Sequence, residues 1–349
     1  MPPHADVLQW EHLPFPKSLR DFQRLFKDDA ACARYLEGAK WPKGFVCPHC
    51  EEKGEPFRMA TRTSVLTCRA CRKQTSLTVD TVMQRTHTPL TVWFWAAYLV
   101  SSMTPGMSAV QFQRQLGLTR YETAFQILHK LRAGMVRQGR DRIGGNLGRG
   151  DHVEVDETYI GGVVRGEGQG PKPDDSVLVS AAVEVRTRPA KKGDKPTRRG
   201  GRYAGRLRLE IVPNRSAKAL VGFVENAVEP GAMVITDAAP AYNKLGMSGY
   251  AHLPVVEAGN PEVAEEFLPI VHLVFSNLKA WLQGTHHGRV EPQHLQAYLN
   301  EFTFRFNRRF YPFNAFRSLL GIGTNGEGPT YAGIYEGTWK HPTMETHHD

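Results

Sequence analysis

A strict alternation of apolar and polar residues marks the middle of the chain as a region of β-strands. In residues 153–160 this period of two predicts a strand with valines on one face and polar side chains on the other, namely Glu154, Asp156 and Thr158. The same reasoning predicts strands at 177–185, 207–212 and 233–237, and a helix at 216–228 with Ser216 as its N-cap. The order strand, strand, strand, helix, strand predicts an α/β domain with a mixed sheet that carries helices.

A helical period dominates the segment before residue 140. Pro89 begins one predicted helix, Ser108 begins a second, and Gly117 forms a turn before a third, which Thr119 caps and which runs to about Met135. Two short helices joined by a glycine-containing turn are typical of a helix-turn-helix motif. If it binds DNA, the third helix enters the major groove with the residues near its leading end, Arg120, Tyr121 and Thr123. A three-helix bundle that never contacts DNA is the alternative.

A further amphipathic helix is predicted at 270–283, and its polar side is narrow. At 100° per residue His272 and Lys279 lie two turns apart in one stripe with Ser276 and Gln283, and apolar residues cover the remaining arc. An imidazole that can bind a metal ion and an ammonium group that can bind phosphate, in one stripe, favour a site for a charged phosphodiester. The alternative is an ordinary solvent-facing stripe.

Composition narrows the class of protein. The chain has 349 residues, 41% of them hydrophobic, which is enough for real cores and argues against disorder. Lys and Arg number 44 against 35 Asp and Glu, a net charge of +9, and this favours an acidic polymer such as nucleic acid as partner. No apolar run approaches the ~20 residues of a membrane span, and no secretory signal opens the chain. We therefore expect a cytoplasmic protein without membrane contact.

Two stretches interrupt the apolar periodicity. Residues 139–150 are dense in glycine and arginine and are interpreted as a linker between two halves. Residues 186–208 contain ten Lys or Arg against the single acid Asp194, and are interpreted as a basic loop that cannot bury a core.

Four of the five cysteines form two C-x2-C pairs separated by seventeen residues: Cys47, Cys50, Cys68 and Cys71. This spacing predicts a closed, tetrahedral structural zinc site, with short strands between the pairs as in a zinc ribbon. A redox C-x2-C is the weaker alternative, because it rarely comes as two pairs. His49 is not needed as a ligand, and Cys32 is expected to be a buried core thiol.

Two carboxylates on neighbouring predicted strands, Asp156 and Asp237, offer the oxygen ligands that Mg²⁺ prefers. Each has a simpler alternative. Asp237 would cap the short helix predicted at 239–245, and Asp156 would lie on the solvent-facing side of a half-buried strand.

These residues together resemble bacterial insertion-sequence transposases of the DDE type, in the branch with an N-terminal zinc ribbon. The resemblance covers about residues 19–317. It is carried by WPKGFVCPHC at 41–50, VDETYIGG at 155–162, ITD at 235–237 and SNLKAWLQGTHHG at 276–288, with a continuation through 294–309.

The resemblance implies an RNase H-like (retroviral-integrase-type) catalytic domain whose metal ligands are Asp156, Asp237 and His272, with Lys279 beside them. Histidine stands where many members have a glutamate, seven residues before the lysine. Glu301 is the fallback candidate for the third acid, but it precedes Arg305 by four residues, so we expect these two residues to form an ion pair along a helix. The implied domains are a helical segment at 1–43, the zinc ribbon at 44–85 and the helix-turn-helix region at 86–140. The catalytic domain follows at 150–320, with its basic insertion at 186–208, and then a loosely packed tail at 321–349.

The implied function is Mg²⁺- or Mn²⁺-dependent cleavage and strand transfer of double-stranded DNA at the element's terminal inverted repeats, by a homodimer or higher multimer. DNA contacts are expected from the basic loop and from His286, His287, Arg305, Arg308 and Arg309; a plain helix-ending turn is the alternative for the two histidines. Two rival functions remain: a domesticated or inactive transposase that acts as a zinc-containing DNA-binding regulator, and a structure-specific nuclease that cuts without joining.

Overall fold

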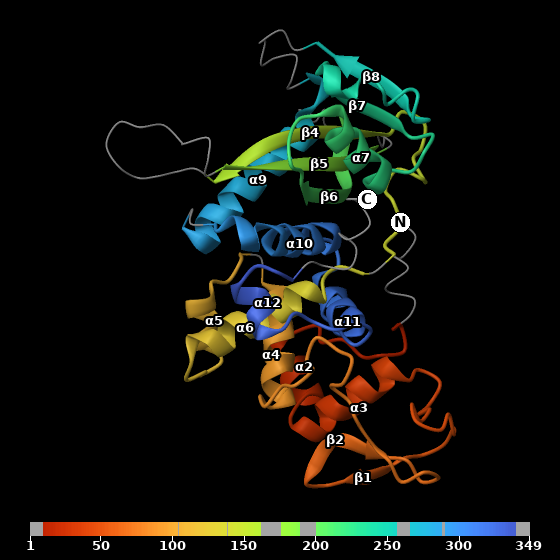
Figure 1. Ribbon diagram of the computed structural model, residues 1–349, viewed down its shortest axis with the longest axis vertical. Coiled ribbons are helices and arrows are strands. Elements are labelled where there is room, and N and C mark those ends of the chain that lie inside the picture. Colours follow the sequence, from red (N-terminus) through yellow and green to blue (C-terminus); the bar gives the residue numbers. More distant parts are fainter. Residues whose placement is uncertain are drawn as a thin grey trace, which may run out of the picture. The chain divides into compact units, whose positions relative to one another are not determined.

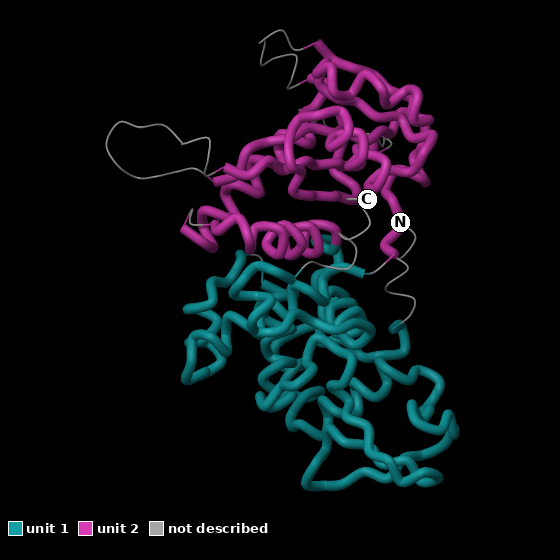
Figure 2. Tube along the Cα trace, viewed as in Figure 1, with its two compact units in different colours: residues 1–138, 308–345 teal, residues 139–307, 346–349 magenta. Residues whose placement is uncertain are grey.

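The computed structural model describes residues 10–103, 105–137, 139–161, 176–188, 200–256, 266–287 and 290–339. The chain divides into two compact units, residues 1–138 with 308–345 and residues 139–307 with 346–349 (Figure 2). Among the helices in the described ranges, none has both the length and the apolar character needed to cross a membrane.

The first unit is mainly helical (Figure 1). Its helices are α2 (Leu19–Leu25), α3 (Asp29–Lys40), α4 (Leu90–Ser102), α5 (Ala109–Gln115), α6 (Tyr121–Ala133), α11 (Pro312–Gly323) and α12 (Tyr331–Tyr335). Five aromatic rings from α2, α3, α4, α11 and the residue after α2 meet with centroids 4.8 to 6.1 Å apart, and they form the centre of this unit: Phe22, Phe26, Tyr35, Phe94 and Phe316. Such packed aromatic contacts provide much of the apolar burial in a small helical core.

The predicted helix-turn-helix helices are present, with one change at the start of the third. Arg120, not Thr119, is the N-cap of α6, and its side chain makes no capping hydrogen bond. The carbonyl of Thr119 instead accepts a hydrogen bond of 3.3 Å from Gln113 Nε2 on α5, which closes the turn between the two helices.

The short strands predicted between the cysteine pairs are also present. They are β1 (Phe57–Met59) and β2 (Arg62–Thr67). A third strand, β3 (Gln74–Ser76), follows the second pair, and the three form an antiparallel sheet in the order β1-β2-β3. Cys32 is fully buried on α3, as predicted, and burial raises the pKa of its thiol to about 12.

The C-terminal region differs from the expected loose tail after residue 320. Helix α11 groups with the first unit and not with the domain expected at 150–320, because residues such as Phe316 belong to the aromatic core. Gly321 lies directly under Trp10, and a Cβ added there would come within 2.2 Å of the indole ring. Residues 324–339 continue through α12, where Ile334 is buried; residues 340–349 lie outside the described ranges.

The second unit is built on a five-stranded mixed sheet. Its strands are β4 (His152–Gly161), β5 (Ser176–Thr187), β6 (Arg202–Ile211), β7 (Met233–Asp237) and β8 (Ala251–Val255), in the order β6-β5-β4-β7-β8. β4, β5 and β6 pair antiparallel, whereas β4, β7 and β8 pair parallel. This sheet is consistent with the RNase H-like domain that the resemblance implies.

Helices cover both faces of this sheet. Helix α7 (Ala217–Ala227) packs on one face, where Ser216 caps it as predicted, and α9 (Pro269–His286) and α10 (Pro292–Arg308) pack on the other. The alternative of a half-buried β4 with a solvent-facing side is therefore wrong: Glu154, on the polar face of this strand, is fully buried. The sheet is doubly covered, so the alternation of polar residues on β4 does not mark a solvent-facing side.

The basic loop is shorter than expected, because β5 runs to Thr187 and β6 begins at Arg202. Several of its predicted residues are thus strand residues, and positions 189–199 lie outside the described ranges. α10 covers β6, the edge strand, with two amides. Asn307 accepts from Leu207 N (2.7 Å) and donates to Leu207 O (3.1 Å), while Gln296 accepts from Ile211 N (2.9 Å).

Candidate functional site

The two candidate aspartates lie on adjacent parallel strands. Asp156 is on β4, and Asp237 is the last residue of β7. In the register of these strands, Glu154 pairs with Ile235. Two residues further along each strand, Asp156 is therefore level with Asp237. Side chains at the same level of neighbouring strands point to the same face, so the two carboxylates project together. Their proximity also appears in the pKa of Asp237, which burial raises and the charge of Asp156 raises further.

The alternative roles of these aspartates are met only in part. Asp237 Oδ1 accepts a hydrogen bond of 3.2 Å from Ala239 N, beside a short 3-10 turn, η2 (Pro240–Tyr242), where a longer helix was expected. Asp156 is not on a solvent-facing side: its side chain is 17% exposed, and Oδ1 accepts from Glu157 N at 2.8 Å.

His272 lies in the first turn of α9 and faces Asp156. Its Nε2 is 3.3 Å from Asp156 Oδ2, and the imidazole is 38% exposed. The structure therefore brings together two of the three predicted ligands by direct contact. The third, Asp237, lies on the neighbouring strand at the same level as Asp156.

Lys279 lies two turns further along α9, on the same polar stripe. Its Nζ donates a hydrogen bond of 2.9 Å to Thr158 Oγ1, two residues after Asp156 on β4. Ser276 and Gln283 are exposed on this stripe, as the helical periodicity predicts, and Lys279 is exposed as well. The stripe thus runs along the edge of the site and not into the core.

Glu154 joins β4 to α9, a role that the sequence pattern did not reveal. Its Oε2 accepts hydrogen bonds from Ile270 N (2.8 Å) and Val271 N (2.7 Å) in the first turn of α9. Negative charge at a helix N-terminus is favourable, because the first N–H groups of a helix have no partner within it. Glu154 therefore sets the position of α9 on the strand that carries Asp156. His272 directly follows the second of these donors.

A second network lies on the α7 side of β4. Glu157 accepts a hydrogen bond of 2.6 Å from the buried Tyr242 hydroxyl, and its Oε1 lies 3.1 Å from Arg215 Nε. Burial raises the pKa of Glu157, and the charges of Asp156 and Asp237 raise it further, while Tyr242 and Arg215 oppose the rise. None of these three residues is among the functional candidates predicted from the sequence.

The donor set around Asp156 fits a hard divalent cation. Two carboxylates that repel each other, one with a raised pKa, are relieved by a cation between them. Over the described residues, the four cysteines are the only group of three or more His, Cys, Asp or Glu side chains whose ligand atoms all lie within 4.8 Å of one another. Asp156, Asp237 and His272 are more widely spaced as a set.

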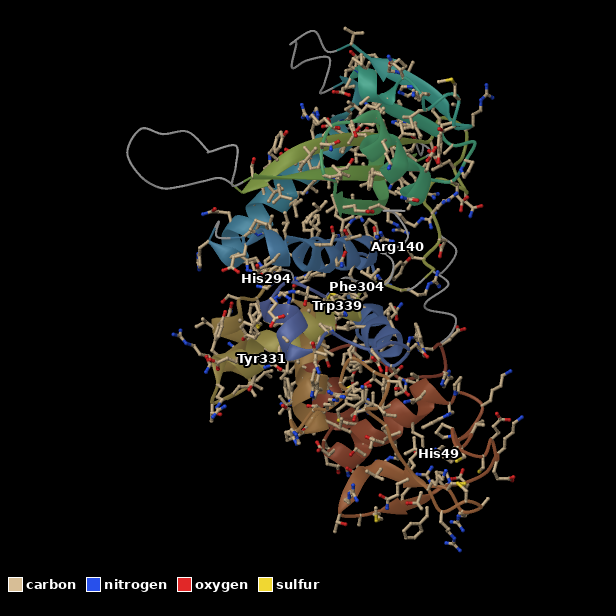
Figure 3. All side chains as sticks on the ribbon, in the orientation of Figure 1. His49, Arg140, His294, Phe304, Tyr331 and Trp339 are labelled. Carbon is tan, nitrogen blue, oxygen red and sulfur yellow. The ribbon has the colours of Figure 1, made fainter. Side chains whose placement is uncertain are left out.

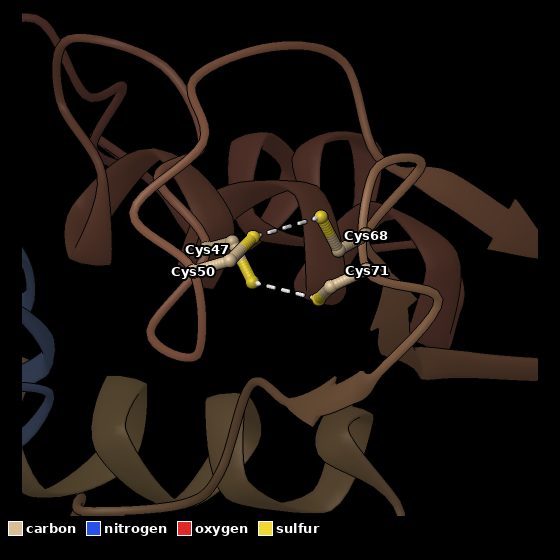
Figure 4. A group of neighbouring side chains, drawn as sticks. All are labelled: Cys47, Cys50, Cys68 and Cys71. Carbon is tan, nitrogen blue, oxygen red and sulfur yellow. Dashed lines mark hydrogen bonds between the residues drawn. The ribbon is translucent and has the colours of Figure 1, made fainter.

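The four cysteines form a closed site of the predicted kind (Figure 4). Cys47 and Cys71 Sγ are 3.7 Å apart, Cys50 and Cys68 Sγ are 3.8 Å apart, and all four sulfurs lie within 4.8 Å of one another. Both C-x2-C segments have the same turn: the first cysteine's carbonyl accepts from the residue after the second cysteine, Glu51 or Arg72, which has a left-handed backbone. Four sulfurs at this spacing fit structural Zn²⁺.

His49 is not part of this sulfur cluster, as predicted. His49 is labelled in Figure 3. Its Nε2 lies 3.4 Å from the carbonyl of Gln74 on β3, and its backbone N–H donates to Cys47 Sγ at 3.4 Å. Backbone donors of this kind stabilise a thiolate. Burial acts to raise the pKa of Cys47, but the N–H groups of His49 and Cys50 contribute to lowering it to about 6.

The residues expected to contact DNA differ in how accessible they are. At the leading end of α6, Arg120 and Tyr121 are exposed and Thr123 is half-buried. After α9, His287 is exposed and is the left-handed C-cap. The helix therefore continues past Gly284 to His286 and ends at His287, as in the helix-ending turn that was the alternative for the two histidines.

The other four candidates are engaged in packing or are half-buried. The His286 ring stacks on Tyr298 with centroids 4.0 Å apart. Arg305 pairs with the buried Glu301 at 3.1 Å, the helical ion pair predicted for Glu301, and its side chain is only 12% exposed. Arg309 packs over the Phe310 ring, 4.4 Å from its centroid, and Arg308 is half-buried at the end of α10.

Comparison with known families gives two matches. Residues 148–307 match the ISXO2-like transposase domain, and residues 27–74 match the transposase zinc-ribbon domain. Searches of curated proteins and of solved structures find no match. The transposase-domain match ends at residue 307, as does the main stretch of the second compact unit, and it contains Asp156, Asp237, His272 and Lys279. Helices α4 to α6 lie outside both matched ranges. The matches indicate DNA transposition, with DNA binding and a divalent metal at the DDE domain.

Proposed function

We propose, from the premise that this chain carries an ISXO2-like transposase domain behind a transposase zinc ribbon, that it cuts DNA at the ends of an insertion sequence and joins those ends to target DNA. One observation supports this most strongly. Asp156 and Asp237 are level on adjacent parallel strands, and His272 Nε2 lies 3.3 Å from Asp156. The rest of the second unit holds these three groups on the face of the sheet that α9 covers.

Both reactions are transfers of a phosphodiester at one site. In cleavage, a water oxygen bonds to phosphorus and the P–O3′ bond breaks, which frees the 3′ hydroxyl of the element. In joining, that hydroxyl loses its proton and attacks a target phosphodiester, and the target's own 3′ oxygen leaves and is protonated. No Ser or Tyr nucleophile is needed, since no covalent protein–DNA link forms.

Each residue has a proposed role in these steps. Asp156, Asp237 and His272 would hold two Mg²⁺ or Mn²⁺ ions. When bound, such ions supply a more acidic attacking hydroxyl and neutralise charge on the leaving oxygen. Lys279 would bind a phosphate oxygen next to the scissile bond as a point charge, with Thr158 fixing its ammonium group.

Recognition of the element's terminal inverted repeats is assigned to the first unit. Arg120, Tyr121 and Thr123 at the start of α6 would read the major groove, and the zinc ribbon would position that region. His287 and Arg308 would add contacts to the DNA backbone that weaken with salt. We leave Arg305 out of this surface, because it pairs with Glu301. Because the two ends of the element are handled together, at least a dimer of the protein would act on DNA.

Asp156→Asn tests the assignment of the catalytic site. The variant keeps the size of the side chain but removes the charge, so cleavage should fall by at least about a thousandfold, or ~4 kcal/mol. Binding of a duplex with the element's end should stay within about twofold of wild type. The assay measures cutting and joining of a labelled end to supercoiled plasmid with Mg²⁺ or Mn²⁺. Cutting by the Asp156→Asn variant at the wild-type rate would remove Asp156 from the site.

The same assay separates the rival functions. A regulator would bind the end but neither cut nor join it with either ion. A structure-specific nuclease would cut branched DNA without an element end and would yield no joined product. Short inverted repeats on both sides of the gene, with duplicated target bases outside them, would support the transposase directly.

A further inference from the structure

Two cations lie on opposite faces of β4, just after Asp156. Lys279 bonds to Thr158 on the α9 side, and Arg215 lies over Tyr159, with the guanidinium carbon 5.6 Å from the ring centroid. Thr158 and Tyr159 are consecutive strand residues, so their side chains point to opposite faces of the sheet. Lys279 is therefore on the same face of β4 as Asp156, and Arg215 lies on the other face of the same strand.

Arg215 is held at this place by a chain of buried contacts. Its Nε lies 3.1 Å from Oε1 of Glu157, whose side chain is 2% exposed, and Oε2 of the same carboxylate accepts the Tyr242 hydroxyl at 2.6 Å. Glu157 and Tyr242 thus fix one end of the guanidinium, next to Asp156 along β4.

The outer end of Arg215 faces solvent. Its side chain is 57% exposed, and Tyr159 beneath it is 52% exposed. The ion pair with the buried Glu157 explains the position of the inner end of Arg215 but not that of its exposed outer end. A guanidinium has two further NH₂ groups besides Nε, and their planar fork matches the oxygens of a phosphate. Exposed aromatic and arginine side chains both contribute to surfaces that bind nucleic acid.

From this geometry we propose that Arg215 binds a backbone phosphate of the target DNA strand, with Tyr159 and Glu157 as its positioning residues. The inference rests on the proposed function, because joining requires two DNA strands at one pair of aspartates. Lys279, on the helix that carries His272, serves the element's strand. Arg215, on the opposite face, serves the strand that the freed 3′ hydroxyl attacks.

The first test measures joining with a pre-cleaved element end and supercoiled plasmid. Arg215→Ala should lower the rate of joining about tenfold, as expected for the loss of one charge-assisted hydrogen bond. Arg215→Lys should recover part of it, because lysine keeps the charge without the fork. Lys218→Ala is the matched control: Lys218 is an exposed cation one turn away on α7. Equal joining by Arg215→Ala and wild type, or an equal loss in Lys218→Ala, would overturn the proposal.

The second test does not depend on catalysis. Binding of a plain duplex is measured against salt concentration for wild type and both alanine variants, and zinc content and thermal unfolding check that each is folded. One lost phosphate contact should reduce the slope of log K against log salt by about 1 in Arg215→Ala only. An unchanged slope would overturn the role of Arg215. A wild type that neither cuts nor joins would overturn the proposed function instead, whatever the slope.

Discussion

At the scale of single residues, buried carboxylates of the second unit hold its backbone in place. Glu154 caps α9, and Glu184, fully buried on β5, accepts from Gly144 N (2.9 Å) and Arg206 N (3.0 Å). Glu184 lies at a β-bulge opposite Gly205. A Cβ added to Gly205 would come within 2.8 Å of the Cβ of Glu184, so the close approach of the two strands requires glycine there. Each of these acids binds backbone N–H groups that would otherwise be buried without a partner, which is costly.

Glu154→Ala should destabilise the second unit by about 2 kcal/mol, because Ile270 and Val271 N–H lose their acceptor. The shift of α9 should also weaken Mn²⁺ binding at Asp156 and His272. Glu154→Gln keeps an acceptor oxygen and should recover most of the stability. Thermal unfolding and Mn²⁺ titration check this. An alanine variant equal to wild type in both would show that α9 does not depend on this cap.

Glu184 should make stability depend on acid pH. Burial acts to raise the pKa of Glu184, but Arg206 and the two backbone donors outweigh it, so the net pKa lies below the usual 4.5. A lowered folded-state pKa gives stability that is present above pH 4.5 and is lost as pH falls through the folded-state value. Glu184→Gln should therefore cost about 3 kcal/mol at pH 7 and progressively less below pH 4.5.

Melting temperatures from pH 3.5 to 7.5 check this prediction. The matched control is Glu225→Gln, an exposed acid on α7 whose replacement should leave the curve unchanged. A difference between Glu184→Gln and wild type that stays constant over the whole range would contradict it.

At the scale of elements, α10 protects the open edge of the sheet. β6 is an edge strand, and unpaired edges invite pairing with other chains. Asn307 bonds both polar groups of Leu207, and Gln296 bonds Ile211 N. Helix α10 thereby supplies hydrogen-bond partners to the backbone of β6, as a sixth strand would. The apolar residues of α10 pack on the same face of the sheet as α9.

Asn307→Ala should free both polar groups of Leu207 and cost about 1–3 kcal/mol. It should also make the protein aggregate at lower concentration than wild type, because the edge is then open. Asn307→Asp can still accept from Leu207 N but cannot donate to Leu207 O, so it should fall between the two. Light scattering and thermal unfolding check this, with Gln293→Ala, an exposed amide on the same helix, as the control. Equal aggregation by Asn307→Ala and Gln293→Ala would contradict the edge role.

At the scale of the whole molecule, the compact units do not follow a simple division of the chain into halves. The first unit takes its core from both ends of the sequence, since Phe316 on α11 packs against Phe22, Phe26 and Phe94. The second unit is one continuous stretch, 139–307, apart from the last residues of the chain.

Truncation after residue 307 should therefore damage the unit that is distant in sequence. Removing α11 takes a fully buried Phe from the aromatic core, which alone costs about 3–5 kcal/mol. Limited proteolysis should then cut quickly within 19–133 and leave 150–307 intact. A fragment of residues 139–307 should unfold in a single transition on its own. Rapid proteolysis of 150–307 in the truncated chain would contradict this division.

The sequence alone determined the features that depend on local spacing. The two C-x2-C turns, the caps of the helices, the period-two strand around Asp156 and the polar stripe of α9 are all short-range patterns, and apart from the shifted cap of α6 the structure contains each of them. The resemblance placed these pieces in one family, and the two domain matches agree with that reading. Strand β8 and the short η2 turn carry weak patterns and were not predicted in this form.

Only the tertiary structure decided what each polar residue contacts. Glu154, Asp156 and Thr158 share one strand face, yet one caps a helix, one faces an imidazole and one binds a lysine, because a different part of α9 passes over each. Burial of Glu154 and Glu184, the place of α11 and the position of Arg215 over Tyr159 all depend on segments far apart in the chain. Periodicity reports which residues share a face, whereas long-range packing determines what covers that face.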